Sequence, residues 1–174
     1  MMSIKIICSI VIIGCSTILG FRAANRYVQR VKEIRMLQMA FAQLESEITG
    51  YSTFLPEAVS GISTAVRGGV RNLFSDFAGR LQNKTGDSVA EAWQESLEKC
   101  QELLNLYPEE IQILAAFGGV LGSGDKESQR RYFSIVQNQL KKQEIKAEEA
   151  CLKYQNMCRS LGLLGGLAIS ILLF

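Results

Sequence analysis

The 174-residue chain contains no histidine, and this absence removes the most versatile general base and metal ligand. Without histidine, neither a Cys-His nor a Ser-His catalytic pair can form. The five cysteines are scattered and include no CxxC pair, which argues against a zinc site and against a disulfide framework. The sequence therefore predicts a protein that is not an enzyme and that holds no metal or cofactor.

Proline is scarce as well, with only two residues, and the glycines gather in a few clusters, a distribution that favours long helices. Apolar residues recur at helical spacing, and no segment shows the alternation of a strand. The net charge is only +2, so the charge balance indicates no nucleic-acid partner. The expected fold is all-α, an elongated bundle of six helices.

Charge is missing from both ends of the chain, in IICSIVIIGCSTILGF at residues 6–21 and SLGLLGGLAISILLF at residues 160–174. Both runs are shorter than the ~20 residues that usually span a bilayer, but the first can be extended through residues 1–5. We expect transmembrane helices at 1–21 and 160–174, around a helical-bundle domain at 22–159. The alternatives are a cleaved signal peptide for the first run and a buried core helix for the second.

Basic residues predict the orientation of these spans. Arg22, Arg26 and Arg30 follow the first run, and Arg159 directly precedes the second. By the positive-inside rule, the central domain faces the cytoplasm and both termini lie outside. The same arginines could contact anionic lipid headgroups, although a role in topology alone also explains them.

Small residues recur four positions apart in both apolar runs. Ser16 and Gly20 form such a pair in the first run, and Gly162 and Gly166 form another in the second. Small residues at this spacing allow close helix packing in a membrane, either between the two spans or between two protomers. Packing between two protomers would give a homo-oligomer. The pattern can also be explained without any packing role, because small residues are common in such spans.

The first helix is expected to continue from the membrane to about Thr49 and to end at Gly50. Its apolar residues follow a coiled-coil-like seam: Tyr27, Ile34, Leu37, Phe41, Leu44, Ile48 and Tyr51. Pro56 suits the first position of a second helix, which should stop near Gly68-Gly69. A third helix should follow from Val70 until Thr85-Gly86 interrupts it.

Three more helices complete the prediction. Ser88 and Glu91 form a capping box before the fourth helix, and Pro108 with Glu109 begins the fifth. The last should start near Asp125 and run into the second span. The fourth helix has the apolar stripe Trp93, Leu97, Cys100, Leu103 and Leu104. The last has the stripe Tyr132, Ile135, Val136, Leu140, Ala147, Cys151, Tyr154, Cys158 and Leu161.

A glycine-rich stretch, GVLGSG at residues 119–124, has the glycine spacing of a phosphate-binding P-loop. The next residue is Asp125 instead of lysine, and its carboxylate would repel a phosphate. Glu127 stands near the position where a P-loop has the serine or threonine that meets magnesium. Nucleotide binding is therefore not expected, and a helix-to-helix turn is the better interpretation, with Gly122 ending one helix and Asp125 capping the next.

Three stretches carry a resemblance to a known family. They are Leu44, Glu45, Glu47 and Ile48, followed by Tyr51 and by LPEA at residues 55–58; Trp93 with Gln94; and LGSGD at residues 121–125 with Gln129. The first is similar to the N-terminal signature, the second to the central Trp-Gln and the third to the hairpin of the stage III sporulation protein AB family, although Gly124 stands where serine is frequent. The resemblance covers essentially the whole chain.

The resemblance implies a membrane protein of endospore-forming bacteria, located in the mother-cell membrane that faces the forespore. Such proteins belong to a channel complex, and their soluble domain is similar to the platform proteins of type II secretion systems and type IV pili. The implied partners are a cytoplasmic secretion-type ATPase, stage III sporulation protein AA, and other membrane subunits of the channel. A membrane-anchored coiled-coil tether or adaptor is the main alternative, and a membrane-bound nucleotide-binding enzyme is a weaker one.

Polar residues near the turns farthest from the membrane are the candidates for partner contact. Glu45, Glu47 and Glu57 lie on one side of this region, and Asp125 and Gln129 lie on the other. Helix capping and solvation would explain the same residues without a partner.

Overall fold

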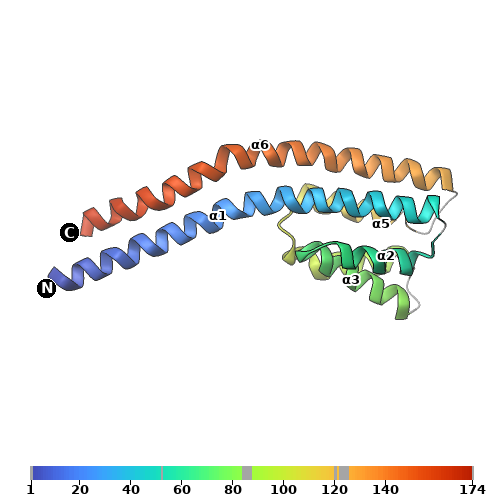
Figure 1. Ribbon diagram of the computed structural model, residues 1–174, viewed down its shortest axis with the longest axis horizontal. Coiled ribbons are helices and arrows are strands. Elements are labelled where there is room, and N and C mark those ends of the chain that lie inside the picture. The colour runs from blue at the N-terminus through green and yellow to red at the C-terminus, as the bar shows by residue number, and fades with distance from the viewer. Residues whose placement is uncertain (1, 52, 84–87, 120, 122–125, 174) are drawn as a thin grey trace. The chain divides into compact units, whose positions relative to one another are not determined.

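The computed structural model describes residues 2–51, 53–83, 88–119, 121 and 126–173 (Figure 1). These residues form six α-helices and two short helical turns, and they contain no strand. The helices are α1 (Met2–Glu45), α2 (Leu55–Ala65), α3 (Gly68–Asn83), α4 (Val89–Cys100), α5 (Pro108–Gly118) and α6 (Lys126–Leu173). The turns are the π-helix η1 (Ser46–Gly50) and the 3₁₀-helix η2 (Gln101–Leu103). The predicted all-α fold with six helices is confirmed.

The chain divides into two compact units, and α1 and α6 contribute to both. The first unit combines Met1–Val31 with Lys146–Phe174, and the second comprises Lys32–Ile145. In the first unit, the rings of Tyr27 and Tyr154 stack with their centroids 5.5 Å apart. The Nζ of Lys153 lies 5.3 Å from the centroid of Tyr154. The stack of Tyr27 on Tyr154 joins α1 to α6 within this unit.

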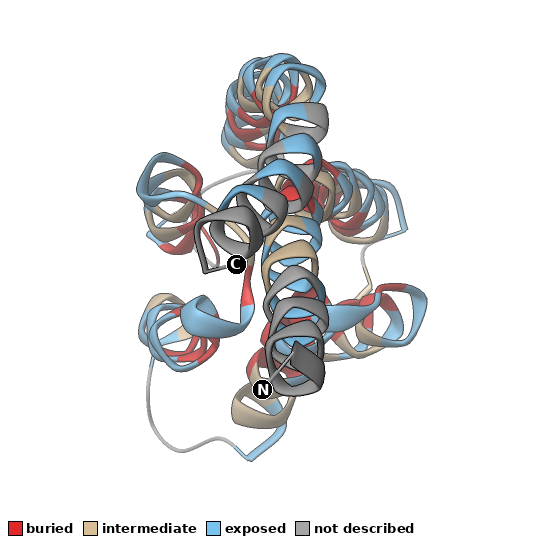
Figure 2. Ribbon diagram, turned by 90° about the vertical axis from the view of Figure 1, so that its left-hand side faces the viewer, coloured by how far each residue is buried: buried red, intermediate tan, exposed pale blue. Residues whose placement is uncertain are grey.

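The core of the second unit is built around Trp93 of α4. Its ring lies 5.1 Å from that of Phe77 and 5.7 Å from that of Phe117, centroid to centroid. Its Nε1 donates a hydrogen bond of 2.7 Å to the carbonyl oxygen of Leu114. A Cβ atom at Gly118 would lie only 2.5 Å from Cδ1 of Trp93, so glycine is needed for α5 to approach the indole. Figure 2 shows the buried positions on the sides of the helices that face one another.

Four residues of the predicted seam on α1, Ile34, Leu37, Phe41 and Leu44, are fully buried. Tyr51 is 78% exposed, so its predicted place on the seam was wrong. The physical reason is that α1 ends at Glu45 and continues as the π-helix η1. A π turn takes in an extra residue and changes the direction of the side chains that follow.

Leu103 was also wrongly predicted to be buried, because it is 55% exposed. The α-helix α4 ends at Cys100, and the tighter η2 turn brings the backbone of Leu103 against α3. A Cβ atom at Gly69 would lie 2.5 Å from the carbonyl oxygen of Leu103. The backbone of Leu103 therefore packs against Gly69, while its side chain is left to solvent.

On α6 the buried stripe differs from the predicted one. Tyr132 and Ile135 are 44% and 43% exposed, whereas Phe133, which the prediction omitted, is buried. The ring of Phe133 lies 5.2 Å from that of Phe117, so it belongs to the aromatic core. Val136 and Leu140 are buried as predicted. The helical spacing is thus correct, but the stripe begins one residue later.

The helix ends agree closely with the capping signals. The Ser88 hydroxyl accepts a hydrogen bond from the Glu91 N–H, and the Glu91 carboxylate accepts one from the Ser88 N–H, so the capping box is confirmed. These bonds lower the pKa of Glu91. Pro56 and Pro108 lie at the starts of α2 and α5. The second helix ends at Ala65, earlier than predicted, and Gly68, with a φ of +62°, begins α3.

Several predicted features lie outside the described residues. They are the break at Thr85-Gly86 and the caps at Gly122 and Asp125. Within the part of the chain that the structure describes, no helix has both the length and the apolar character to cross a membrane. The predicted spans lie in α1 and α6, and their place in a membrane stays a prediction.

Candidate partner-binding surfaces

The turn that joins α1 to α2 carries two of the predicted partner-binding residues, Glu45 and Glu47. Both are half-buried. The carboxylate of Glu47 accepts a hydrogen bond of 2.8 Å from the Thr53 hydroxyl, and its carbonyl oxygen accepts one of 3.0 Å from the Thr53 N–H. The Thr49 hydroxyl donates to the carbonyl oxygen of Glu45 at 2.8 Å. These bonds fix the shape of the turn.

The other candidates lie on α2 and α6. Glu57 is exposed in the first turn of α2, where the positive end of the helix dipole favours a carboxylate. Gln129 lies near the start of α6 and is half-buried, and Asp125 lies outside the described residues. The fold therefore places Glu45, Glu47 and Glu57 in and directly after one turn.

Two aromatic residues in this turn were missed as surface residues. Tyr51 follows η1 and is 78% exposed, and Phe54 precedes α2 and is 80% exposed. The available signal was the position of Phe54 directly before Leu55-Pro56, because the residue before a helix start lies outside the helical stripe. The turn thus presents aromatic rings beside carboxylates.

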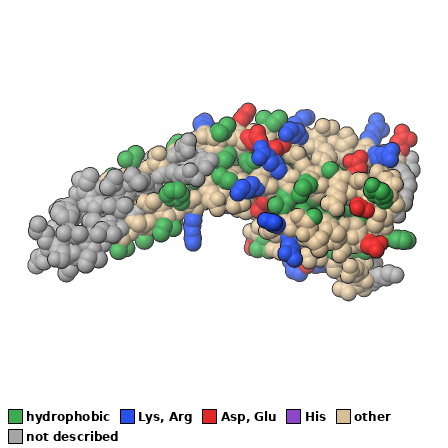
Figure 3. Space-filling model, viewed as in Figure 1, with side chains coloured by type: hydrophobic (Ala, Val, Ile, Leu, Met, Phe, Trp, Pro, Cys, Tyr) green, Lys and Arg blue, Asp and Glu red, His purple; other side chains and the backbone are tan. Residues whose placement is uncertain are grey.

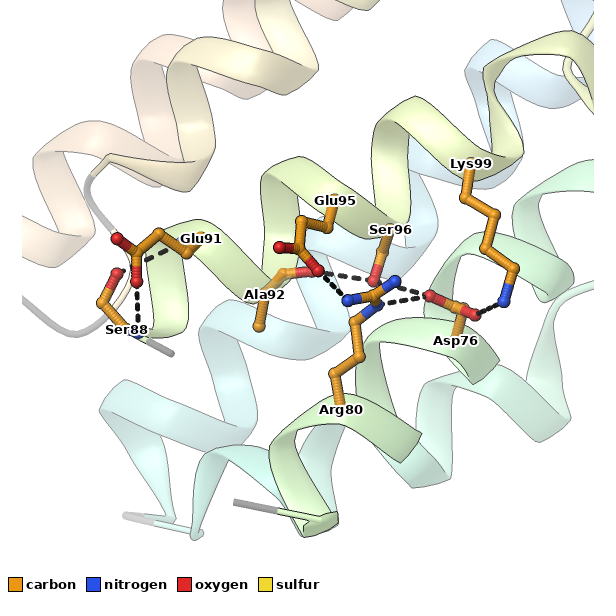
Figure 4. A network of polar contacts seen from close by, with 8 residues as sticks. All are labelled: Asp76, Arg80, Ser88, Glu91, Ala92, Glu95, Ser96 and Lys99. Carbon is orange, nitrogen blue, oxygen red and sulfur yellow. Dashed lines mark hydrogen bonds and ion pairs between the residues drawn. The ribbon is translucent and has the colours of Figure 1, made fainter. Parts of the chain in front are cut away.

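A second surface lies between α3 and α4, where Asp76 is the centre of a polar network (Figure 4). Its carboxylate accepts hydrogen bonds from Nε of Arg80 at 2.8 Å and from the Ser96 hydroxyl at 3.0 Å. It also pairs with Nζ of Lys99, while the Arg80 guanidinium pairs with Glu95. The network ties three positions of α4 to a single turn of α3.

The electrostatics of the network follow from these bonds. Burial disfavours the ionised form of Asp76, but hydrogen bonds from Lys99, Arg80 and Ser96 outweigh it, so the pKa of Asp76 is lowered. The hydrogen bond to Asp76 raises the pKa of Arg80. Burial, with the nearby Asp76 charge, raises the pKa of the Cys100 thiol. A thiol with a raised pKa is a poor nucleophile, so Cys100 offers no obvious chemistry.

Beside the network lies an open groove of about 630 Å³. Its lining residues are Asn72, Ser75, Asp76, Gly79, Arg80, Asn83, Lys99, Cys100 and Leu103. The charged groups in the groove bind one another, so their evident role is to hold α3 on α4. Among the described residues, no three acidic or thiol side chains gather as a metal site.

Replacing Asp76 with asparagine should lower the free energy of unfolding by about 1 kcal/mol. The loss is modest because the Lys99 and Arg80 side chains are partly in solvent, where water replaces part of their interaction with Asp76. Urea unfolding followed by the fluorescence of Trp93, the single tryptophan, measures this loss. The Glu95→Gln variant is the control, because the Glu95 side chain is 52% exposed and should matter less. An equal loss of stability in both variants would contradict the conclusion that Asp76 is the centre of the polar network between α3 and α4.

A carboxylate also joins α1 to α6 within the second unit. Glu144 is buried and accepts hydrogen bonds from Nε of Arg35 at 2.7 Å, Nζ of Lys141 at 2.7 Å and Nε2 of Gln38 at 3.1 Å. The bonds from Lys141 and Arg35 lower the pKa of Glu144 to about 2. The Gln137 side chain adds a bond of 2.8 Å to the carbonyl oxygen of Gln38.

The loop before α5 is held to α1 by a second buried carboxylate. Glu33 accepts hydrogen bonds from the backbone N–H of Asn105 at 2.6 Å and from its side-chain amide at 2.8 Å. Glu110, also buried, accepts one of 2.6 Å from the Tyr107 N–H. Glu33, Glu110 and Glu144 are thus buried with structural partners. Glu57 is exposed, which makes the α1–α2 turn the better candidate for contact with another protein.

Comparison with known proteins agrees with this architecture. The family model described as "Stage III sporulation protein AB" matches residues 5–174. The chain belongs to the stage III sporulation protein AB family. Stage III sporulation protein AB of Bacillus subtilis (strain 168) is 35% identical over 170 residues, which cover 98% of this chain and 99% of that protein. A solved structure of a stage III sporulation protein AB matches with a TM-score of 0.68 and 34% identity, covering 71% of this chain and 97% of that one.

Some of the residues that carry the family resemblance have a structural role here. The LPEA sequence forms the first turn of α2, and Trp93 is the centre of the aromatic core. Leu121, the first residue of the LGSGD sequence, is buried, and the rest of that sequence lies outside the described residues. Core packing therefore explains Trp93 and Leu121, whereas Glu45 and Glu57 are accessible at least in part.

Proposed function

We propose that this protein is a membrane-anchored platform subunit of the channel complex between mother cell and forespore, and that it docks a cytoplasmic secretion-type ATPase. The observation that carries the proposal is full-length membership of the stage III sporulation protein AB family. In this proposal the ATPase, stage III sporulation protein AA, performs the ATP chemistry. The helical domain supplies the surface on which it docks, and other membrane subunits complete the channel.

Apolar side chains of the first unit support the membrane anchor. Large exposed apolar residues lie on the parts of α1 and α6 that form this unit: Val11, Ile18, Leu19, Phe21, Leu152, Met157 and Leu164. A surface of this kind is unfavourable in water and is typical of contact with lipid or protein. Ser16 and Gly20 are half-buried, and Gly162 and Gly166 lie in α6. Both small-residue pairs thus belong to helices that we propose to pack closely in the membrane.

The proposed orientation places the central domain in the cytoplasm and both termini outside. Arg22 and Arg26 are exposed beside the apolar segment, where a bilayer surface with anionic lipids would attract them. Arg30 is buried, so it is less suited to lipid contact. Arg159 lies in α6 next to the second segment. The stacked Tyr27 and Tyr154 suit the aromatic belt of a membrane interface.

A pull-down tests the docking role. Full-length protein in detergent should capture the purified ATPase of the same organism. Reversing the charge at Glu45, Glu47 and Glu57 together should weaken the capture by about tenfold or more, because close charge pairs at interfaces are costly to invert. Unchanged capture by this triple variant would refute the assignment of these residues.

A matched triple variant controls for net charge. Glu98, Glu102 and Glu109 are exposed on or beside α4 and α5, and their change to lysine alters the net charge equally. Capture should persist in this control. If both triple variants lose the ATPase alike, the effect comes from bulk charge and the proposed site is wrong. If the wild-type protein itself captures no ATPase, the docking function is wrong.

A further inference from the structure

Tyr51 and Phe54 are the most exposed large apolar residues of the second unit. They are 78% and 80% exposed, whereas no other large apolar side chain described in that unit exceeds the 55% of Leu103. An aromatic side chain can bury roughly 150–250 Å² when it is covered. Two such rings within four residues of each other therefore leave a large apolar area in contact with water.

Hydrogen bonds hold the backbone at Tyr51, Thr53 and Phe54. The Tyr51 N–H donates to the carbonyl oxygen of Ser46 at 3.2 Å, and Thr53 is bound twice to Glu47. The carbonyl oxygen of Phe54 accepts hydrogen bonds from the N–H groups of Glu57 and Ala58, both at 3.0 Å. The aromatic residues are thus fixed to the end of η1 and to the start of α2. Hydrogen bonds that hold Tyr51 and Phe54 to the neighbouring helices reduce the ordering cost of binding.

The carboxylates beside the rings indicate which kind of partner surface would be complementary to this turn. Glu47 lies four residues before Tyr51, and exposed Glu57 lies three residues after Phe54. Figure 3 shows hydrophobic and acidic side chains close together on the end of the second unit where η1 turns into α2. The complementary surface is an apolar pocket with lysine or arginine at its rim.

We infer that Tyr51 and Phe54 form an aromatic knob that inserts into a basic-rimmed apolar pocket on the cytoplasmic ATPase. This inference rests on the proposed function and names the residues that provide the binding energy. Interface energy concentrates in a few aromatic or arginine anchors surrounded by polar groups. The two rings are the anchors, and Glu57 with Glu47 provides the surrounding charge.

Binding of the purified ATPase to the full-length protein in detergent, measured by biolayer interferometry, tests the knob. Tyr51→Ala with Phe54→Ala should raise Kd by at least ~10-fold, and the Tyr51→Phe and Phe54→Tyr variants should bind like the wild type. Leu152→Ala, at a residue that is 79% exposed, should leave Kd unchanged. All variants should unfold within about 2 °C of the wild type, because the altered side chains lie in solvent.

Different results separate the two proposals. An unchanged Kd in the double alanine variant, with firm binding by the wild type, refutes the knob and leaves the docking function intact. No binding by the wild type refutes the docking function itself. A photo-crosslinking amino acid at position 54 in sporulating cells should yield a product with the ATPase. Crosslinks only to a second copy of this chain, or only to lipid, would overturn the inference.

Discussion

Replacing Trp93 with alanine should lower the free energy of unfolding by about 3–5 kcal/mol, the largest loss expected for any single change in the second unit. The indole is fully buried among rings from α1, α3 and α5 and forms the buried hydrogen bond to the carbonyl oxygen of Leu114. Its removal leaves a cavity and breaks this hydrogen bond. Urea unfolding of the full-length protein in detergent, followed by circular dichroism, measures the loss.

Two further variants make this result specific. Gly118→Val should also be strongly destabilising, by about 1–3 kcal/mol, because its side chain would collide with the Trp93 ring. Leu103→Ala should change stability by less than ~0.5 kcal/mol, since this leucine is mostly in solvent. A loss below ~1 kcal/mol for Trp93→Ala would show that the helices of the second unit do not depend on the aromatic core.

Acid should destabilise the second unit through Glu144. Its pKa is lowered to about 2 in the folded state from an ordinary value of 4.5. A carboxylate with a depressed pKa stabilises the fold above its unfolded pKa, and the stabilisation disappears as the pH falls through the folded pKa. The shift corresponds to about 3 kcal/mol, lost between roughly pH 5 and pH 2. This is an upper value, because Arg35 and Lys141 are more than half exposed.

The Glu144→Gln variant tests this assignment. At neutral pH it should be less stable than the wild type, and the difference should shrink as the pH falls towards about 2. Urea midpoints measured at several pH values between these limits give the two curves. Lys142→Gln, at an exposed neighbouring position, should follow the wild-type curve. Parallel curves for the wild type and Glu144→Gln would show that Glu144 does not link stability to pH.

Local signals predicted most of the helical architecture. The Ser88–Glu91 capping box and the prolines at residues 56 and 108 marked the helix starts, because capping and proline geometry depend only on nearby residues. The seam on α1 was correct from Ile34 to Leu44 because it continues through an unbroken α-helix. These features are local, so the sequence alone contains them.

The errors occurred where a helix changes type or where burial depends on a neighbouring helix. Tyr51 follows the π turn and is exposed, although it was predicted to lie on the buried seam. Leu103 lies in the 3₁₀-helix after α4 and is also exposed, although it was predicted to be buried. Phe133 was omitted, although it is buried, because its burial depends on the ring of Phe117 on another helix. A periodicity argument assumes a constant helical repeat and cannot detect such changes.

The polar contacts of the candidate surfaces were also beyond the reach of sequence patterns. Arg35 and Glu144 are 109 positions apart, and Glu33 and Asn105 are 72 apart. No local rule relates residues at such separations, and only the packed helices bring them together. The acidic residues Glu45 and Glu57 could be placed near a turn from sequence. Phe54 could have been placed there too, from its position directly before the helix start, but the exposure of Tyr51 depends on the π turn, which sequence patterns do not reveal.

Co-purification from sporulating cells tests the central claim most directly. The tagged full-length protein, extracted in mild detergent from cells in sporulation, should bring down stage III sporulation protein AA together with other membrane proteins of the channel. Quantitative mass spectrometry should find the ATPase strongly enriched over a purification from untagged cells. Recovery of the protein with no enrichment of the ATPase would contradict the docking function and favour a tether or adaptor role.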